Sequence, residues 1–191
     1  GYESIGGYHA DVTGVEWIAS DNGRTGLAKF WGGADEMVTT SYPGITGTGP
    51  RSISVWIRIE VSGVRAICSW GNAGGPGARW SFYLDDGKLE LMVITGQTIT
   101  GITSLNDGIW HHVLLVFPRN ATDVGDVNFY VDGVPEPHND LPQFVDTGCD
   151  LDMEIGQSLA ANTWRGWMDD VRIYDIEISP GQVAAIYAAE Q

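Results

Sequence analysis

The sequence is short of several features that would point to a particular class of protein. Its 191 residues contain no apolar run near the roughly 20 residues that a membrane-spanning helix needs, so we expect no membrane insertion. There is no internal repeat and no low-complexity segment. Basic residues are scarce, with ten Lys and Arg against 25 Asp and Glu and a formal net charge of −15. Such a charge repels phosphate groups and argues against nucleic acid and anionic membranes as partners.

Cysteine is scarce as well. Only Cys68 and Cys149 are present, far apart in the chain. They either form one long-range disulfide bond of an exported protein or serve as small core residues, and both alternatives stay open here. The chain starts in a Gly-rich stretch without a recognisable leader. We therefore expect a mature fragment, or a module of a longer chain with neighbouring domains as partners.

What the sequence does contain is the pattern of many short strands. Gly, Asn, Asp and Pro are scattered between short β-branched and aromatic runs. Within SISVWIRIE (52–60), apolar residues at every second position predict a half-buried strand. The pairs Asp86-Gly87 and Asp132-Gly133 predict tight hairpin turns. We therefore predict an all-β fold, a two-sheet antiparallel sandwich in which residues 1–191 form a single domain.

Two further segments carry local predictions. In GLAKFWGGADEMVTT (26–40) a Gly-Gly pair separates two short strands, which we interpret as a hairpin or a tight loop. Near the other end, Ser179 stands where an N-cap belongs, Pro180 at the first helical position and Gln182 three residues after the cap. This capping box predicts a short C-terminal helix within 178–190.

Four blocks of the sequence span residues 26–187: GLAKFWGGADEMV, SISVWIRI, NDGIWHHVLLVF with NFYVDGVP, and GWMDDVRIYDIEISPGQVAAIY. Taken together, they resemble the laminin-G-like family of bacterial exported multidomain proteins. The resemblance implies a concanavalin A-like jelly-roll sandwich. It also implies a secreted or cell-surface module that binds carbohydrate or mediates adhesion, and that is not an enzyme.

The most distinctive block contains Trp110, His111 and His112. Adjacent imidazoles can shuttle protons or bind a metal ion. Neighbours on a strand point to opposite faces, however, so the two histidines cannot converge on one ion. In similar proteins this block is structural, and we interpret it so here.

A calcium ion is implied by the resemblance. In similar proteins an acidic residue of the early block and one of the late block often hold a structural calcium, which needs several oxygen ligands. Carried over by position, these are Asp35 and Asp169, with Glu36 and Asp170 as adjacent candidates. The early block departs from the family pattern, since Trp31 stands where an Asp is common.

One segment supports a catalytic alternative. In CDLDMEIG the residues Asp150, Asp152 and Glu154 alternate with apolar residues, so a regular strand would place three carboxylates on one face. The segment resembles the Glu-x-Asp-x-Glu strand of jelly-roll glycoside hydrolases, with Asp at the nucleophile position. Paired carboxyl groups at strand spacing can act as nucleophile and acid.

The ligand surface is predicted from the tryptophans, of which the chain has eight. Aromatic faces hold the C–H surfaces of sugars, and arginines offer donors to hydroxyl or acidic groups. We predict that the ligand surface comprises residues beside glycine-rich or polar loops: Trp70, Arg79, Trp80, Trp164 and Arg165. Its ligand would be a glycan or polysaccharide, or a cell-surface protein. A purely structural inter-domain module is the remaining alternative.

Overall fold

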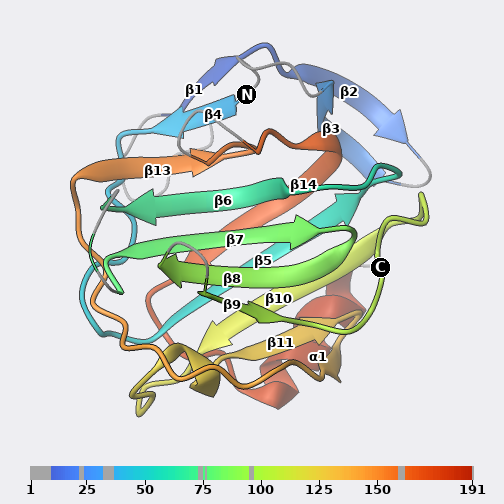
Figure 1. Ribbon diagram of the computed structural model, residues 1–191. Helices are drawn as coiled ribbons and strands as arrows, with labels where there is room; N and C mark the ends of the chain where they lie inside the picture. The colour runs from blue at the N-terminus through green and yellow to red at the C-terminus, as the bar shows by residue number, and fades with distance from the viewer. Residues whose placement is uncertain are drawn as a thin grey trace.

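The strands lie in two antiparallel sheets packed face to face, as the resemblance implied (Figure 1). The computed structural model describes residues 10–21, 24–31, 37–72, 75, 77–94, 97–158 and 162–190. Within them each sheet has seven strands. The first sheet contains, in spatial order, β1 (Ala10–Thr13), β4 (Met37–Thr40), β13 (Leu151–Ile155), β6 (Arg65–Gly71), β7 (Arg79–Asp85), β8 (Lys88–Ile94) and β9 (Gln97–Thr100). The second contains β12 (Val134–Glu136), β11 (Asn128–Val131), β10 (His111–Phe117), β5 (Arg51–Arg58), β14 (Arg165–Tyr174), β3 (Arg24–Trp31) and β2 (Glu16–Asp21).

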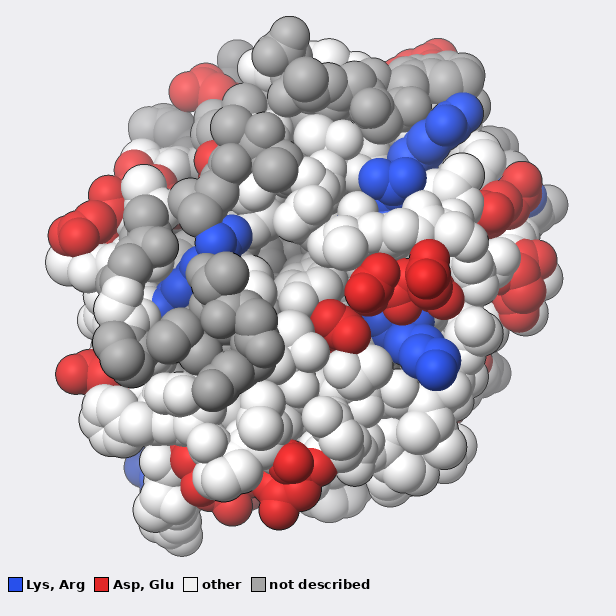
Figure 2. Space-filling model, viewed as in Figure 1, with Lys and Arg blue, Asp and Glu red and all other residues white. Residues whose placement is uncertain are grey.

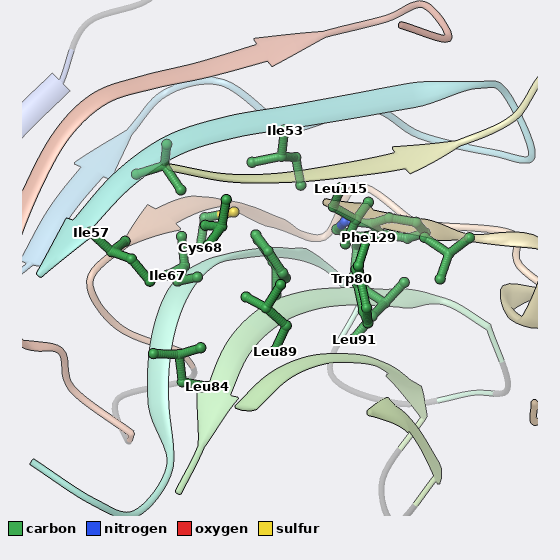
Figure 3. Close-up of a cluster of buried hydrophobic side chains, with 14 of the residues drawn as sticks. Ile53, Ile57, Ile67, Cys68, Trp80, Leu84, Leu89, Leu91, Leu115 and Phe129 are labelled. Atoms are coloured by element: carbon green, nitrogen blue, oxygen red, sulfur yellow. The ribbon is translucent and has the colours of Figure 1, made fainter. Parts of the chain in front are cut away.

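The core fills the space between the sheets, and strand alternation selects its side chains. On β5 the fully buried Ile53, Val55 and Ile57 point inward from the second sheet. On β7 of the first sheet, Phe82 and Leu84 meet them from the opposite side. Figure 3 shows these inward side chains interlocking between the two layers. Each fully buried aliphatic or aromatic side chain stabilises the fold by about 1.5–3 kcal/mol.

The outer face of the second sheet is also covered, which the sequence did not predict. Helix α1 (Pro180–Glu190) lies against it, and its Val183 packs with Leu114 and Val116 of β10. Strand β5 was expected to be half-buried, but its outward residue Trp56 is only 5% exposed. The difference arises because α1 shields this face from solvent.

The predicted turns and the helix start are confirmed. Asp86 and Gly87 have φ of 46° and 84°, and Asp132 and Gly133 have 50° and 77°, so each pair has the two positive angles of a two-residue hairpin turn. At the start of α1 the backbone N–H of Ser179 donates to the Gln182 side chain. The N–H of Gln182 donates back to the Ser179 hydroxyl, so the capping box is formed.

The hairpin expected in residues 26–40 is wrong. β3 pairs with β2 and β14 in the second sheet, whereas β4 pairs with β1 and β13 in the first. The two strands therefore belong to different layers. Residues 32–36, which join them, lie outside the described residues.

The cysteines do not form a disulfide bond. Cys68 is a core residue, and burial raises the pKa of its thiol to about 12. Cys149 is exposed. The core alternative therefore holds for Cys68 only. No helix in the described part of the chain is long and apolar enough to cross a membrane.

A buried arginine organises the loop that precedes β5. The Arg51 side chain is fully buried, and its guanidinium donates to the backbone carbonyls of Ile45, Gly47 and Gly49 and to the Thr147 hydroxyl, over 2.7–3.1 Å. Its central carbon lies 4.8 Å from the ring centroid of Trp80. Burial lowers the pKa of Arg51 to about 10. The guanidinium thus stays charged at neutral pH and fastens this loop to residue 147.

The two histidines of the Trp110 block contact different surroundings, as strand alternation predicted. The His112 Nε2 atom lies 2.8 Å from the Ser54 hydroxyl, beneath α1, and burial lowers the pKa of His112 to about 4. His111 lies between two carboxylates, with Nδ1 2.9 Å from Asp132 Oδ2 and Nε2 3.3 Å from Asp107. The hydrogen bond to Asp132 raises the pKa of His111, although burial opposes it.

Replacing Arg51 with alanine should lower the free energy of unfolding by about 3 kcal/mol, because several backbone carbonyls lose a charge-assisted donor. Urea denaturation followed by tryptophan fluorescence measures this loss. The exposed Arg119 provides the control, since Arg119→Ala should change the value by less than about 0.5 kcal/mol. A similarly small loss for Arg51→Ala would show that the guanidinium does not support the loop.

The His111→Gln substitution should lower the free energy of unfolding, relative to the wild type, more in acid than in alkali. The folded pKa of His111 lies above the ordinary value of 6.5. Its contribution is therefore complete below that pH and is lost as the pH rises through the folded pKa. We expect the difference in the free energy of unfolding between the wild type and this variant to be largest below about pH 6.5 and to shrink as the pH rises above it. A difference independent of pH would contradict an ionised His111.

Candidate functional site

The outer face of the first sheet is the candidate site, because a hollow opens at one end of it. Figure 2, drawn from the same side as Figure 1, shows this face, with acidic side chains at the margins and in one cluster to the right of the centre. On β7, alternation turns Arg79, Ser81 and Tyr83 outward, since their neighbours Phe82 and Leu84 belong to the core. The face is therefore built mainly from polar side chains.

A hollow of about 420 Å³ opens at the end of this face where β1, β4 and β13 lie side by side. Its volume falls within the range of small-molecule sites, about 300–1,000 Å³. Most of its lining residues carry side-chain oxygen atoms. The residues with side-chain oxygens are Asp11, Thr40, Ser41, Asp152 and Glu154. The two apolar lining residues are Leu151 and Met153.

A β-bulge arranges the carboxylates of β13. Leu151 pairs with Gly71 and Glu154 with Ser69, so three steps along β13 match two along β6. Met153 points into the core with no exposed surface, and Asp152 and Glu154 line the hollow. The expected row of three carboxylates is wrong, because Asp150 precedes the strand and does not line the hollow.

Arg79 lies beside the hollow, toward the middle of the sheet. Its Nε donates to the Ser81 hydroxyl at 2.7 Å, and its terminal nitrogen contacts the Ser158 hydroxyl. Burial lowers the pKa of Arg79, and the charge of Glu154 opposes that shift. Glu154 and Ser69 are directly paired, and Ser69 is paired with Ser81 in turn. A hydroxyl row therefore links the carboxylates of the hollow to the guanidinium.

A second polar row crosses β7, β8 and β9. Tyr83 is paired with Glu90, and Glu90 with Thr100. The Thr100 hydroxyl donates to Glu90 Oε1 at 2.9 Å, and the Tyr83 side chain also bonds to Glu90. Burial raises the pKa of Glu90, although both hydrogen bonds lower it. Sequence reasoning missed this row, but the Asp86-Gly87 turn fixes the register that places Tyr83 opposite Glu90.

The predicted tryptophan surface is not formed. Trp70, Trp80 and Trp164 are 2%, 0% and 0% exposed, so the expectation that their rings face solvent is wrong. Alternation sends Trp80 to the same side as Phe82, and it stacks on Trp70 inside the core. Arg79 and Arg165 lie on different sheets, β7 and β14. Of the five residues, only Arg79 lies beside the hollow.

The residues proposed for calcium are described only in part. Asp35 and Glu36 lie outside the described residues, so the calcium prediction stays a prediction. Asp169 Oδ2 accepts a hydrogen bond from Arg24 Nε at 2.8 Å, and Asp170 Oδ2 accepts one from the same guanidinium at 3.2 Å. Within the described ranges, no three His, Cys, Asp or Glu side chains are grouped to hold a metal ion.

Comparison with known families places this geometry in context. A family model described as the concanavalin A-like lectin/glucanases superfamily, Laminin_G_3, matches residues 32–184. No curated protein matches the chain.

Several solved structures share the fold. Domain 4 of AbnA, a GH43 extracellular arabinanase from Geobacillus stearothermophilus in complex with arabinotriose, has a TM-score of 0.70 at 16% identity, over 95% of this chain and 90% of that one. The botulinum neurotoxin serotype G binding domain has a TM-score of 0.68 at 16% identity over 96% of this chain. The receptor binding domain of botulinum neurotoxin D has 0.66 at 17% over 95%. The chain spans only 46% and 48% of those two toxin chains.

Truncating a core tryptophan tests the corrected placement. Trp164→Ala should lower the free energy of unfolding by about 3–5 kcal/mol, because it leaves a cavity in the core. Phe144, which is 55% exposed, is the matched control, and Phe144→Ala should change stability by less than about 0.5 kcal/mol. Chemical denaturation of both variants measures this. If both variants lost equally little free energy of unfolding, Trp164 would have to lie at the surface, and the tryptophan-lined ligand site would again be supported.

Proposed function

The chain belongs to the concanavalin A-like lectin/glucanases superfamily, and we propose that it is a carbohydrate-binding module that holds its ligand on the outer face of the first sheet. The hollow between β1, β4 and β13 is the observation that carries this proposal. A sugar presents hydroxyl groups that both donate and accept hydrogen bonds. Carboxylates such as Asp152 and Glu154 accept from them, and the hydroxyls of Thr40 and Ser41 do both.

The structural neighbours support this class of ligand. The arabinanase domain that shares the fold is in complex with arabinotriose, and two further neighbours are toxin binding domains. At identities of 16–17% these likenesses concern the fold, so the sugar itself is proposed from the hollow alone. A cell-surface protein that carries glycans would present the same chemistry. The extracellular arabinanase also supports the proposal that this chain is secreted or displayed at a cell surface.

Glycoside hydrolysis is the second candidate, and the raised pKa of Glu90 favours it, since a general acid needs such a shift. The carboxylates that line the hollow are those of Asp11, Asp152 and Glu154, and the last two lie on β13. β8 is three strands away from β13, which amounts to about 14 Å at the usual strand spacing of about 4.8 Å. Catalytic carboxylate pairs lie only about 5–9.5 Å apart. Glu90 is therefore too far from Asp152 and Glu154 to form such a pair with them, and hydrolysis would have to rest on the Asp152 and Glu154 carboxylates of the hollow themselves.

Binding should depend on the carboxylates of the hollow. The double variant Asp152→Asn, Glu154→Gln should bind a retained glycan about 10- to 100-fold more weakly, because it loses two charged acceptors. A glycan array, probed with and without calcium, identifies the glycan, and titration calorimetry measures the affinity. Running both conditions also tests whether calcium supports the fold or the ligand.

Asp175 provides a matched control, since it is exposed just beyond the end of β14 in the second sheet. Asp175→Asn should leave the affinity unchanged. Release of reducing ends from a retained polysaccharide would favour the hydrolase alternative. Absence of any retained glycan would leave the structural inter-domain role.

A further inference from the structure

Arg24, the first residue of β3, lies in an aromatic environment. Its guanidinium carbon lies 4.1 Å from the ring centroid of Trp56 on β5 and 5.7 Å from that of Trp110, which precedes β10. Both distances are within the roughly 6 Å over which a cation is attracted to an aromatic face. The side chain is only 12% exposed, so this attraction acts largely out of contact with water.

Oxygen acceptors complete the surroundings of the same guanidinium. Nε donates to Asp169 Oδ2 at 2.8 Å, and one terminal nitrogen donates to Asp170 Oδ2 at 3.2 Å. The other terminal nitrogen donates to the backbone carbonyl of Glu190 at 3.0 Å. Each nitrogen therefore has its own acceptor, which is a pattern that a planar guanidinium satisfies and a spherical ammonium does not.

A bulge in β14 directs the carboxylates of Asp169 and Asp170 toward the Arg24 guanidinium. The pairing of β14 with β5 shifts between Asp169 and Arg172, and Asp170 adopts a φ of 51°, in the left-handed region. The Asp170 N–H also donates to Asp169 Oδ1 at 2.9 Å, which fixes one carboxylate against the next. The bulge turns both acids toward one point on the outer face.

The end of α1 depends on the same residues. The indole N–H of Trp56 donates to Glu190 Oε2 at 3.0 Å, and Tyr187 stacks on the Trp56 ring with centroids 5.8 Å apart. Glu190 stands in the last turn, where a negative charge opposes the helix dipole. The cations Arg24 and Arg172, which both contact Glu190, offset that charge.

We propose a guanidinium-binding site that Arg24 occupies from within the same chain. The site is formed by Trp56, Trp110, Asp169, Asp170 and the end of α1. This occupancy holds the last turn of α1 on the second sheet. The acids that sequence comparison suggested for calcium thus hold an organic cation. Removal of the Arg24 side chain opens a site of defined chemistry, for a planar cation with several N–H donors.

Chemical rescue of the full chain tests the proposal. Arg24→Ala should melt at a lower temperature than the wild type and exchange the backbone amide protons of residues 184–190 faster. Millimolar methylguanidinium should reverse both effects in the variant. At ten times its Kd it should shift the unfolding equilibrium about tenfold. The wild type should not respond, because its site is filled, and Arg119→Ala should behave as the wild type.

Methylammonium at the same concentration is the control ligand, since it has the charge without the planar donors. Equal rescue by methylammonium or by calcium would overturn the proposal in favour of a general cation site. An equal response of the wild type and the variant to methylguanidinium would overturn it too. Where Arg24→Ala does not fold by itself, its refolding yield from urea is measured with each ligand. A higher yield with methylguanidinium than with methylammonium then supports the proposal, and equal yields overturn it.

Discussion

Strand alternation is the constraint on which the rest of this structure depends. It sends consecutive side chains to opposite faces, so the inward faces of the two sheets supply one apolar core, and each outward face stays available for another use. On β7 the constraint buries Trp80 and Phe82 and turns Ser81 outward. The same alternation turns Ser54 of β5 away from the core and under α1, where it meets His112.

The outward faces of the two sheets differ in what lies on them. α1 closes the face of the second sheet by placing Val183 on the apolar residues of β10, and a buried polar group there, such as His112, bonds to Ser54. The face of the first sheet has hydroxyl and carboxylate groups in rows and a hollow at the β1–β4–β13 end. The hollow offers polar groups to an outside ligand, which is why the proposed sugar site lies there.

Much of the fold was predictable because its signals are local. The alternation in 52–60, the two Asp-Gly pairs and the capping box at Ser179 each involve neighbouring residues, and the structure has the strand, the turns and the helix. The burial of Trp80 also had a local signal, since it shares its parity with Phe82 and Leu84. The expected tryptophan surface ignored that parity.

Other features required knowledge of which strands become neighbours. No local signal says that β3 and β4 enter different sheets, and the hollow exists only because β1, β4 and β13 are adjacent. Arg24 reaches Asp169 across 145 positions of sequence for the same reason.

The distribution of the few basic side chains bears on the choice of ligand. Arg51 donates its hydrogen bonds to the loop before β5, and Arg24 donates to Asp169, Asp170 and the end of α1. These cations bond to internal acceptors, whereas Figure 2 shows acidic side chains at the surface, both at the margins and in one cluster to the right of the centre. An acidic polysaccharide would meet repulsion that acts over about 8 Å at physiological salt. Beside the hollow, the charge of Arg79 is offset by that of Glu154, so a neutral sugar fits the proposed site better than an acidic one.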